Sequence, residues 1–205
     1  MVMTTTTNPV APESVFGQLE QVLPLVAKPI QYVGGEVNSV IKEWSDTSVR
    51  WVLMYPDAYE VGAPNQGVQI LYEVINGVQD ALAERTYAVW PDLEALMRER
   101  GIPQFTVDAH RPVRSFDVFG LSFATELGYT NMLTALDLAG IPLHAVDRTD
   151  DDPLVVAGGH AAFNPEPIAD FIDAAVLGDG EQAALTITDL VRDFKAEGSP
   201  GGRGE

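Results

Sequence analysis

The chain contains no cysteine, and this absence excludes several kinds of chemistry. Without thiols these residues form no disulfide, no thiolate zinc site, no cysteine nucleophile and no cysteine-ligated iron–sulfur cluster. Basic residues are also scarce, because 12 Lys and Arg stand against 30 Asp and Glu and the formal net charge is −18. A field of that sign repels phosphate backbones and anionic membranes, so we expect neither a nucleic-acid partner nor a membrane partner.

Long apolar runs are missing as well, and residues 1–9 lack the basic end and apolar block of a signal peptide. We therefore expect a cytoplasmic protein. Hydrophobic residues make up 46% of the 205 residues, which is enough for a substantial core. Composition predicts disordered ends at 1–12 and 198–205, a helical N-terminal extension at 13–49 and one α/β domain at 50–197.

From residue 50 onward, short apolar runs alternate with segments of helical periodicity. This alternation is typical of a parallel sheet that is covered by helices on both faces. We therefore predict an α/β fold with a doubly wound, mostly parallel five-stranded sheet. The predicted strands are 50–54, 87–90, 116–122, 154–157 and 174–177, and the predicted helices include 13–26, 66–78, 125–138 and 181–196.

Four loops leave the predicted strands at the carboxyl edge of the sheet, where folds of this kind bind ligands. They are 55–62, 122–126, 158–164 and 178–181, and three of them are rich in Gly, Asp or Glu. Glycine allows the backbone to approach a ligand closely, although a tight strand-to-helix turn needs the same residues. Each loop alone is more simply explained as such a turn, but their joint occurrence favours a ligand site.

The residues of these loops do not match the common cofactor motifs. No G-x-G-x-x-G follows the first strand, and no P-loop sequence occurs. Asp57 and Glu60 disfavour a phosphate in the first loop and suit a neutral or cationic ligand. His160 is a candidate ligand or proton donor, whereas Ser122 lies in no nucleophile elbow. A cation site formed by the loop acids, or a hydrolase site with His160, is a weaker alternative.

Three of these segments resemble parts of a known family. Asp57-Ala58-Tyr59-Glu60-Val61-Gly62 is similar to the D-x-H-x-x-G loop of cobalamin-binding domains, with tyrosine in the place of the histidine. Gly158-Gly159 resembles the Gly-Gly loop after the fourth strand of that domain. Phe171 to Ala183 is similar to the D-x-(apolar)-x-G-E-G-E segment of radical S-adenosylmethionine (SAM) proteins. Together with wider similarities, these segments look like the N-terminal, cobalamin-binding-like region of a radical SAM protein family, over about residues 14–195.

The resemblance implies a flavodoxin-like fold and a module that binds cobalamin at the carboxyl edge. Because Tyr59 replaces the cobalt-binding histidine, a bound cobalamin would have no lower ligand from the protein. No catalytic residue or metal ligand is expected in this chain. The implied cofactor-binding residues are Asp57, Tyr59, Glu60, Gly62, Ser122, Gly158, Gly159, His160, Gly178, Gly180 and Glu181.

The resemblance also implies a partner. The catalytic barrel of the family carries C-x-x-x-C-x-x-C for an iron–sulfur cluster and uses SAM, and it is expected after the last helix. On this interpretation the chain is the N-terminal module without its barrel, through a truncated gene, a shortened form or a split system. It would work with a radical SAM catalytic domain in cis or in trans and would catalyse nothing alone. The competing interpretation is a scaffold that has lost its cofactor and docks the catalytic partner.

Overall fold

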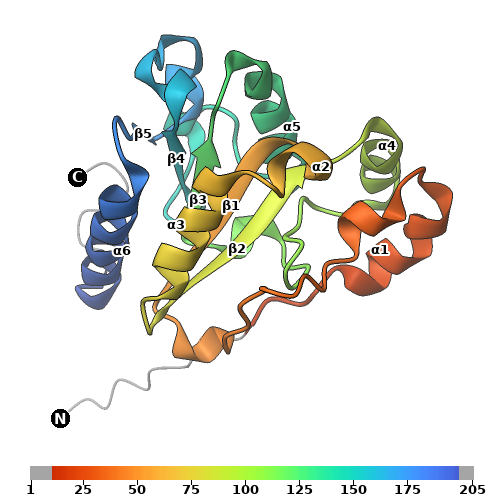
Figure 1. The fold of residues 1–205 in the computed structure, drawn as a ribbon, viewed down its shortest axis with the longest axis horizontal. Helices are drawn as coiled ribbons and strands as arrows, with labels where there is room; N and C mark the ends of the chain where they lie inside the picture. The colour runs from red at the N-terminus through yellow and green to blue at the C-terminus, as the bar shows by residue number, and fades with distance from the viewer. Residues whose placement is uncertain (1–10, 199–205) are drawn as a thin grey trace.

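The computed structural model describes residues 11–198, so the predicted disordered ends fall mainly outside the described residues. Five parallel strands form one sheet in the order β2-β1-β3-β4-β5 (Figure 1). This is the flavodoxin-like order, and the predicted doubly wound α/β fold is confirmed. The strands are β1 Val49–Ala58, β2 Ala81–Ala88, β3 Val118–Ser122, β4 Leu154–Gly158 and β5 Ala174–Ala175. The α-helices are α1 Phe16–Val22, α2 Tyr59–Gly62, α3 Gln66–Asn76, α4 Pro91–Arg100, α5 Tyr129–Ala139 and α6 Gly180–Ala196.

Helices cover both faces of the sheet, and alternate residues of β1 show how. Trp51 and Leu53 pack in one apolar cluster with residues of α3 and α6. Val52 and Met54 point to the opposite face and pack in a second cluster with α5. Successive side chains of a strand point to opposite faces, so a strand buried on both sides reads as a continuous apolar run. The interior strand β1 was therefore recognisable from its sequence.

The N-terminal extension forms a third apolar cluster, in which Leu19 of α1 packs near Leu93 and Met97 of α4. Its helix is shorter than the predicted 13–26, because α1 ends at Val22 and a 3-10 turn that contains Pro24 follows. Proline has no N–H to donate and blocks the continuation of an α-helix. The apolar spacing was correct as a guide to burial, but it did not determine the length of the helix.

The second strand departs most from its prediction, since β2 begins six residues before the expected segment 87–90. The reason lies in two buried charged residues, Glu84 and Arg85, which are only 1% and 5% exposed. Glu84 pairs with Arg111, and Arg85 pairs with Asp108 at 2.6 Å. Two adjacent charged residues interrupt the apolar run, so the pattern does not indicate a strand there. The residues that neutralise Glu84 and Arg85 lie elsewhere in the sequence and make their burial tolerable.

None of the helices within residues 11–198 combines the length and apolar character that crossing a membrane requires.

Candidate functional site

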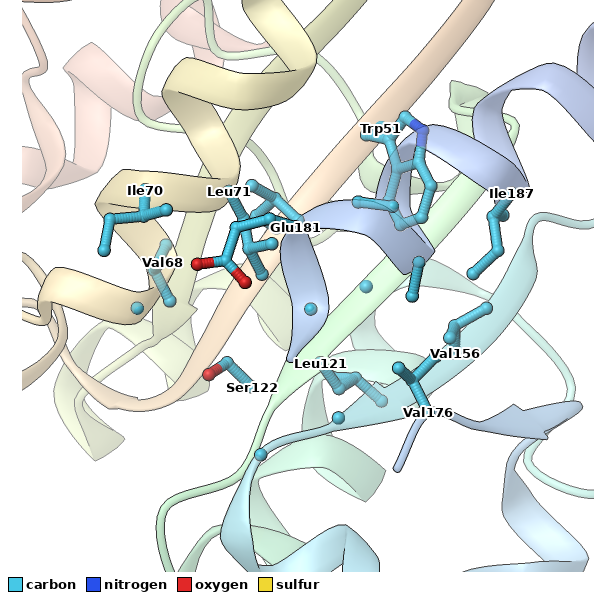
Figure 2. Close-up of a pocket in the computed structure, with 18 of the residues that line it drawn as sticks. Trp51, Val68, Ile70, Leu71, Leu121, Ser122, Val156, Val176, Glu181 and Ile187 are labelled. Carbon is cyan, nitrogen blue, oxygen red and sulfur yellow. The ribbon is translucent and has the colours of Figure 1, made fainter. Parts of the chain in front are cut away.

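A cavity of about 190 Å³, partly open to solvent, lies at the carboxyl side of the sheet between the strands and helices α3 and α6 (Figure 2). Residues of both β1 and β3 line it. These neighbouring strands mark the point at which the strand order reverses, and doubly wound sheets bind ligands at such switch points. The cavity is therefore the best candidate for a ligand site in the described part of the chain.

The walls of the cavity are apolar. Trp51 of β1, Leu71 of α3, Val156 of β4 and Ile187 of α6 line it from four elements. The indole nitrogen of Trp51 donates a hydrogen bond to the Thr188 hydroxyl at 2.9 Å. The polar edge of the indole is thus satisfied by α6, and its carbon surface remains as a cavity wall.

Small residues create the space. Gly120 of β3 lies under the large side chains of β1, and a Cβ at this position would be 3.1 Å from Leu53 and 3.2 Å from Trp51. On the opposite side, α6 presents Ala183 and Ala184 to the cavity. Larger side chains at these positions would fill the cavity, so its volume is a consequence of three specific small residues.

Two polar side chains border this apolar space, Ser122 at the end of β3 and Glu181 in the first turn of α6. Figure 2 shows the serine hydroxyl and the glutamate carboxylate, and the other side chains labelled there are apolar apart from the indole nitrogen. No Lys, Arg or His is among the described lining residues. The cavity therefore suits a largely apolar ligand that carries hydrogen-bond donors, and it is unsuited to a phosphate.

Six of the predicted site residues come together around this cavity: Ser122, Gly158, Gly159, Gly178, Gly180 and Glu181. They come from the loops after β3, β4 and β5. His160, by contrast, is exposed at the start of the 3-10 turn His160–Phe163 and does not line the cavity.

The predicted first loop, 55–62, is in fact the end of β1 and the short helix α2, and its residues do not line the cavity. The Tyr59 hydroxyl donates to Glu36 at 2.8 Å, and its ring meets Tyr87 edge-on with centroids 5.3 Å apart. Glu60 pairs with Lys28 at 2.7 Å. Burial, followed by the hydrogen bond and charge of Glu36, raises the pKa of Tyr59 to about 12. This tyrosine is therefore a neutral hydrogen-bond donor at physiological pH, held by the extension and by β2.

The other two predicted residues of this loop have structural contacts. The exposed carboxylate of Asp57 accepts a hydrogen bond from the backbone N–H of Ala58 at 2.7 Å. Gly62 is buried against Tyr87, and a Cβ there would lie 2.5 Å from the ring. Within residues 11–198, no group of three or more His, Asp or Glu side chains is placed to hold a metal ion. The loop acids thus do not form the cation site considered as an alternative.

Sequence reasoning missed the walls of the site, including Trp51, Leu71, Val176 and Ile187. Apolar residues at strand and helix spacing are expected in any core, so nothing in their own pattern indicates a cavity. The feature that could have indicated a cavity was the presence of Gly120 in the middle of β3 together with the adjacent Ala183 and Ala184 on α6. That signal has meaning only once the two elements are known to face each other.

Gly159 has a conformation that only glycine tolerates well, which leads to a stability prediction. Its φ is +91°, and a Cβ would lie 2.4 Å from the Phe123 carbonyl oxygen. We expect Gly159→Ala to lower the free energy of unfolding by about 2–4 kcal/mol in urea denaturation, because both backbones must shift. Gly158→Ala is the matched control, since the nearest atoms to its Cβ are 4.0 Å away. Its cost should stay below about 1 kcal/mol, and equal losses in the two variants would contradict this account.

Comparison with protein families assigns the chain to a family. A family model described as "Radical SAM proteins, N-terminal" matches residues 67–203, more than half of the chain. The chain belongs to this family. A search of curated proteins gave no match. The family is by its description the N-terminal part of radical SAM proteins, so its members are expected to associate with a radical SAM catalytic region.

The family match includes the predicted residues that line the cavity but does not include segment 57–62. All six predicted residues that line the cavity lie inside 67–203, whereas the first loop, 57–62, lies outside the radical SAM N-terminal match. The resemblance of the first loop to a cobalamin-binding motif is therefore independent of the family assignment.

Proposed function

We propose that this chain is the cofactor-binding module of a radical SAM iron–sulfur enzyme, that it binds cobalamin without a histidine ligand, and that it is catalytically incomplete alone. The observation that carries the proposal is the apolar cavity at the switch point between β1 and β3. Its border is formed by Ser122, the Gly158-Gly159 pair and the segment Gly178 to Glu181. The last two of these are among the segments that resemble cobalamin-binding domains.

The size of the cavity suits one part of cobalamin. Sites for complete small molecules usually measure about 300–1,000 Å³, and this cavity has about 190 Å³. A corrin ring is too large for it, whereas the flat, apolar benzimidazole of the cobalamin nucleotide matches its size and its walls. Trp51 and Leu71 would pack on that ring and exclude water from it, which is the main favourable contribution of such walls.

The polar border and the first loop have different roles in this proposal. Glu181 and Ser122 would accept hydrogen bonds from the hydroxyl and amide groups of the cofactor near the cavity. Tyr59 offers no ligand to cobalt, because its neutral hydroxyl is bound to Glu36. Bound cobalamin would supply cobalt-centred methyl transfer or radical chemistry in the complete enzyme. This chain would contribute binding and orientation.

Titration of the purified chain with hydroxocobalamin tests the proposal. We expect saturable binding, detected as a change in the visible spectrum and as heat in calorimetry. The matched ligand is cobinamide, which keeps the corrin but lacks the benzimidazole nucleotide. We expect it to bind at least ~10-fold more weakly, a difference of about 1.4 kcal/mol. The absence of saturable hydroxocobalamin binding at high micromolar concentration would refute the cofactor proposal.

A specific observation favours a second candidate, a scaffold that docks the catalytic domain. Large apolar side chains are exposed on four loops at the carboxyl edge: Val61 at 49%, Leu127 at 85%, Phe163 at 63% and Leu177 at 59%. Other large apolar side chains are exposed elsewhere, but these four follow successive strands of one sheet and can together form an interaction surface. The strong negative charge of the chain disfavours pairing with a second copy and favours a basic partner surface. A complex with a radical SAM catalytic domain in sedimentation analysis, without any cobalamin binding, would support this candidate over the first.

A further inference from the structure

The N-terminal extension makes unexpectedly direct contact with the first βα loop. One carboxylate oxygen of Glu36 accepts the hydrogen bond from Tyr59 at 2.8 Å, and the other pairs with Arg85 of β2 at 2.7 Å. Eight residues before Glu36, Lys28 pairs with Glu60 at 2.7 Å. The two polar side chains of α2, Tyr59 and Glu60, are therefore both bound to the extension.

The segment 28–40 is itself anchored on both sides of Glu36. On one side, the Tyr32 hydroxyl accepts from the backbone N–H of Trp90 at 3.1 Å. On the other, the backbone N–H of Val40 donates to the Tyr72 hydroxyl at 2.7 Å, and Ser39 donates to Asp108 at 3.0 Å. Because both ends are fixed to the α/β domain, the carboxylate of Glu36 is held at one place relative to β2.

Two glycines allow the close approach that these contacts need. Gly34 has a φ of +65°, and a Cβ there would lie 2.2 Å from the Val107 carbonyl oxygen. Gly62, at the end of α2, packs closely against the ring of Tyr87. Glycine thus lets segment 28–40 pack on the backbone of Val107 and lets α2 pack on Tyr87, on either side of the Glu36–Tyr59 hydrogen bond.

We propose that residues 28–40 form a strap that holds the first βα loop against β2, and that Glu36 is the residue that positions Tyr59 there. The strap explains why Tyr59 lies outside the cavity lining although it stands in a loop at the ligand-binding edge. Only one consequence of the strap rests on the proposed function. It is that cofactor recognition depends on the cavity and does not involve Tyr59.

Hydrogen exchange of the full chain without cofactor tests the strap directly. The amides of Ala63 and Asn65 donate to carbonyls of α2 at 2.8 and 3.0 Å and report on its opening. We expect Glu36→Ala and Tyr59→Phe each to accelerate exchange over 59–65 by ~10-fold or more, because local opening becomes easier. Exchange in β3 should remain at the parent rate. Glu43→Ala, an exposed glutamate of the same extension, is the matched control and should change neither region.

Two outcomes would overturn the proposal. One is unchanged exchange over 59–65 in both variants, and the other is equal acceleration in β3, which would show a global loss of stability. A second measurement compares hydroxocobalamin binding by the parent and Tyr59→Phe. Equal affinity is expected, and a loss of ~10-fold or more in the variant would place Tyr59 in the ligand site. If neither protein binds cobalamin, the cofactor proposal fails, whereas the exchange result still decides on the strap.

Discussion

Replacing Ala183 with phenylalanine is expected to abolish cobalamin binding while the chain stays folded. Ala183 lies on α6 and lines the cavity, so a phenyl ring at this position would occupy the space proposed for the benzimidazole. We expect the affinity for hydroxocobalamin to fall by ~100-fold or more, which corresponds to about 2.8 kcal/mol of binding free energy. Visible-spectrum titration and calorimetry measure the loss.

The neighbouring substitution Gln182→Phe provides the matched control. Gln182 is exposed on the same helix and is not among the cavity-lining residues, so the same ring would extend into solvent. Its hydroxocobalamin affinity should equal that of the parent. Thermal unfolding of both variants should show a stability near that of the parent, because filling a cavity with an apolar ring costs little when the ring fits. Parental affinity in Ala183→Phe would show that the cavity is not the cofactor site.

The second large effect concerns a buried ion pair of the α/β domain that also contacts the extension through Glu36. Arg85 pairs with Asp108 at 2.6 Å, and the two side chains are 7% and 3% exposed. Burial alone would lower the pKa of Arg85, but the hydrogen bonds and the charge of Asp108 outweigh it and raise that pKa above its ordinary value. The guanidinium therefore stays charged throughout the stable pH range and balances two carboxylates, those of Asp108 and Glu36.

We expect Arg85→Met to lower the free energy of unfolding by about 3–5 kcal/mol, because Asp108 would remain buried without its cation. Adding Asp108→Asn to this variant should recover part of the loss, since it removes the uncompensated charge. Urea denaturation of the parent, the single variants and the double variant measures both effects. Arg98→Met is the matched control: its pairs with Glu94 and Asp137 are 30–53% exposed. That change should cost about 1 kcal/mol or less, and a similarly small cost for Arg85→Met would contradict the role given to the buried pair.

Elements whose burial is uniform were predictable from the sequence. The interior strand β1 and the amphipathic helices α3 and α6 lie close to where apolar spacing placed them. Gly140 ends α5 in the left-handed conformation, with a φ of +68°, which glycine adopts without a steric penalty. In these cases the local pattern and the tertiary environment agree, so the pattern alone is sufficient.

Prediction was less successful where partners distant in sequence decide the structure. The strand β2 contains Glu84 and Arg85, which are tolerated inside only because Arg111 and Asp108 reach them from a later segment. The first loop was grouped with the other loops of the carboxyl edge, because they leave the same edge of the sheet. Tyr59 is instead bound to Glu36, 23 residues earlier in the chain. A sequence pattern contains no information on which of two available partners a side chain meets.

The sequence by itself determined the fold class and indicated six of the residues that line the cavity, because loop position follows from local periodicity and chain connectivity. It also excluded cysteine-based chemistry from these residues. Only the tertiary structure decided that small residues of β3 and α6 leave a cavity against Trp51, and that the strap holds Tyr59 away from it. Both depend on side-chain packing between distant segments, and packing is a property of the folded chain.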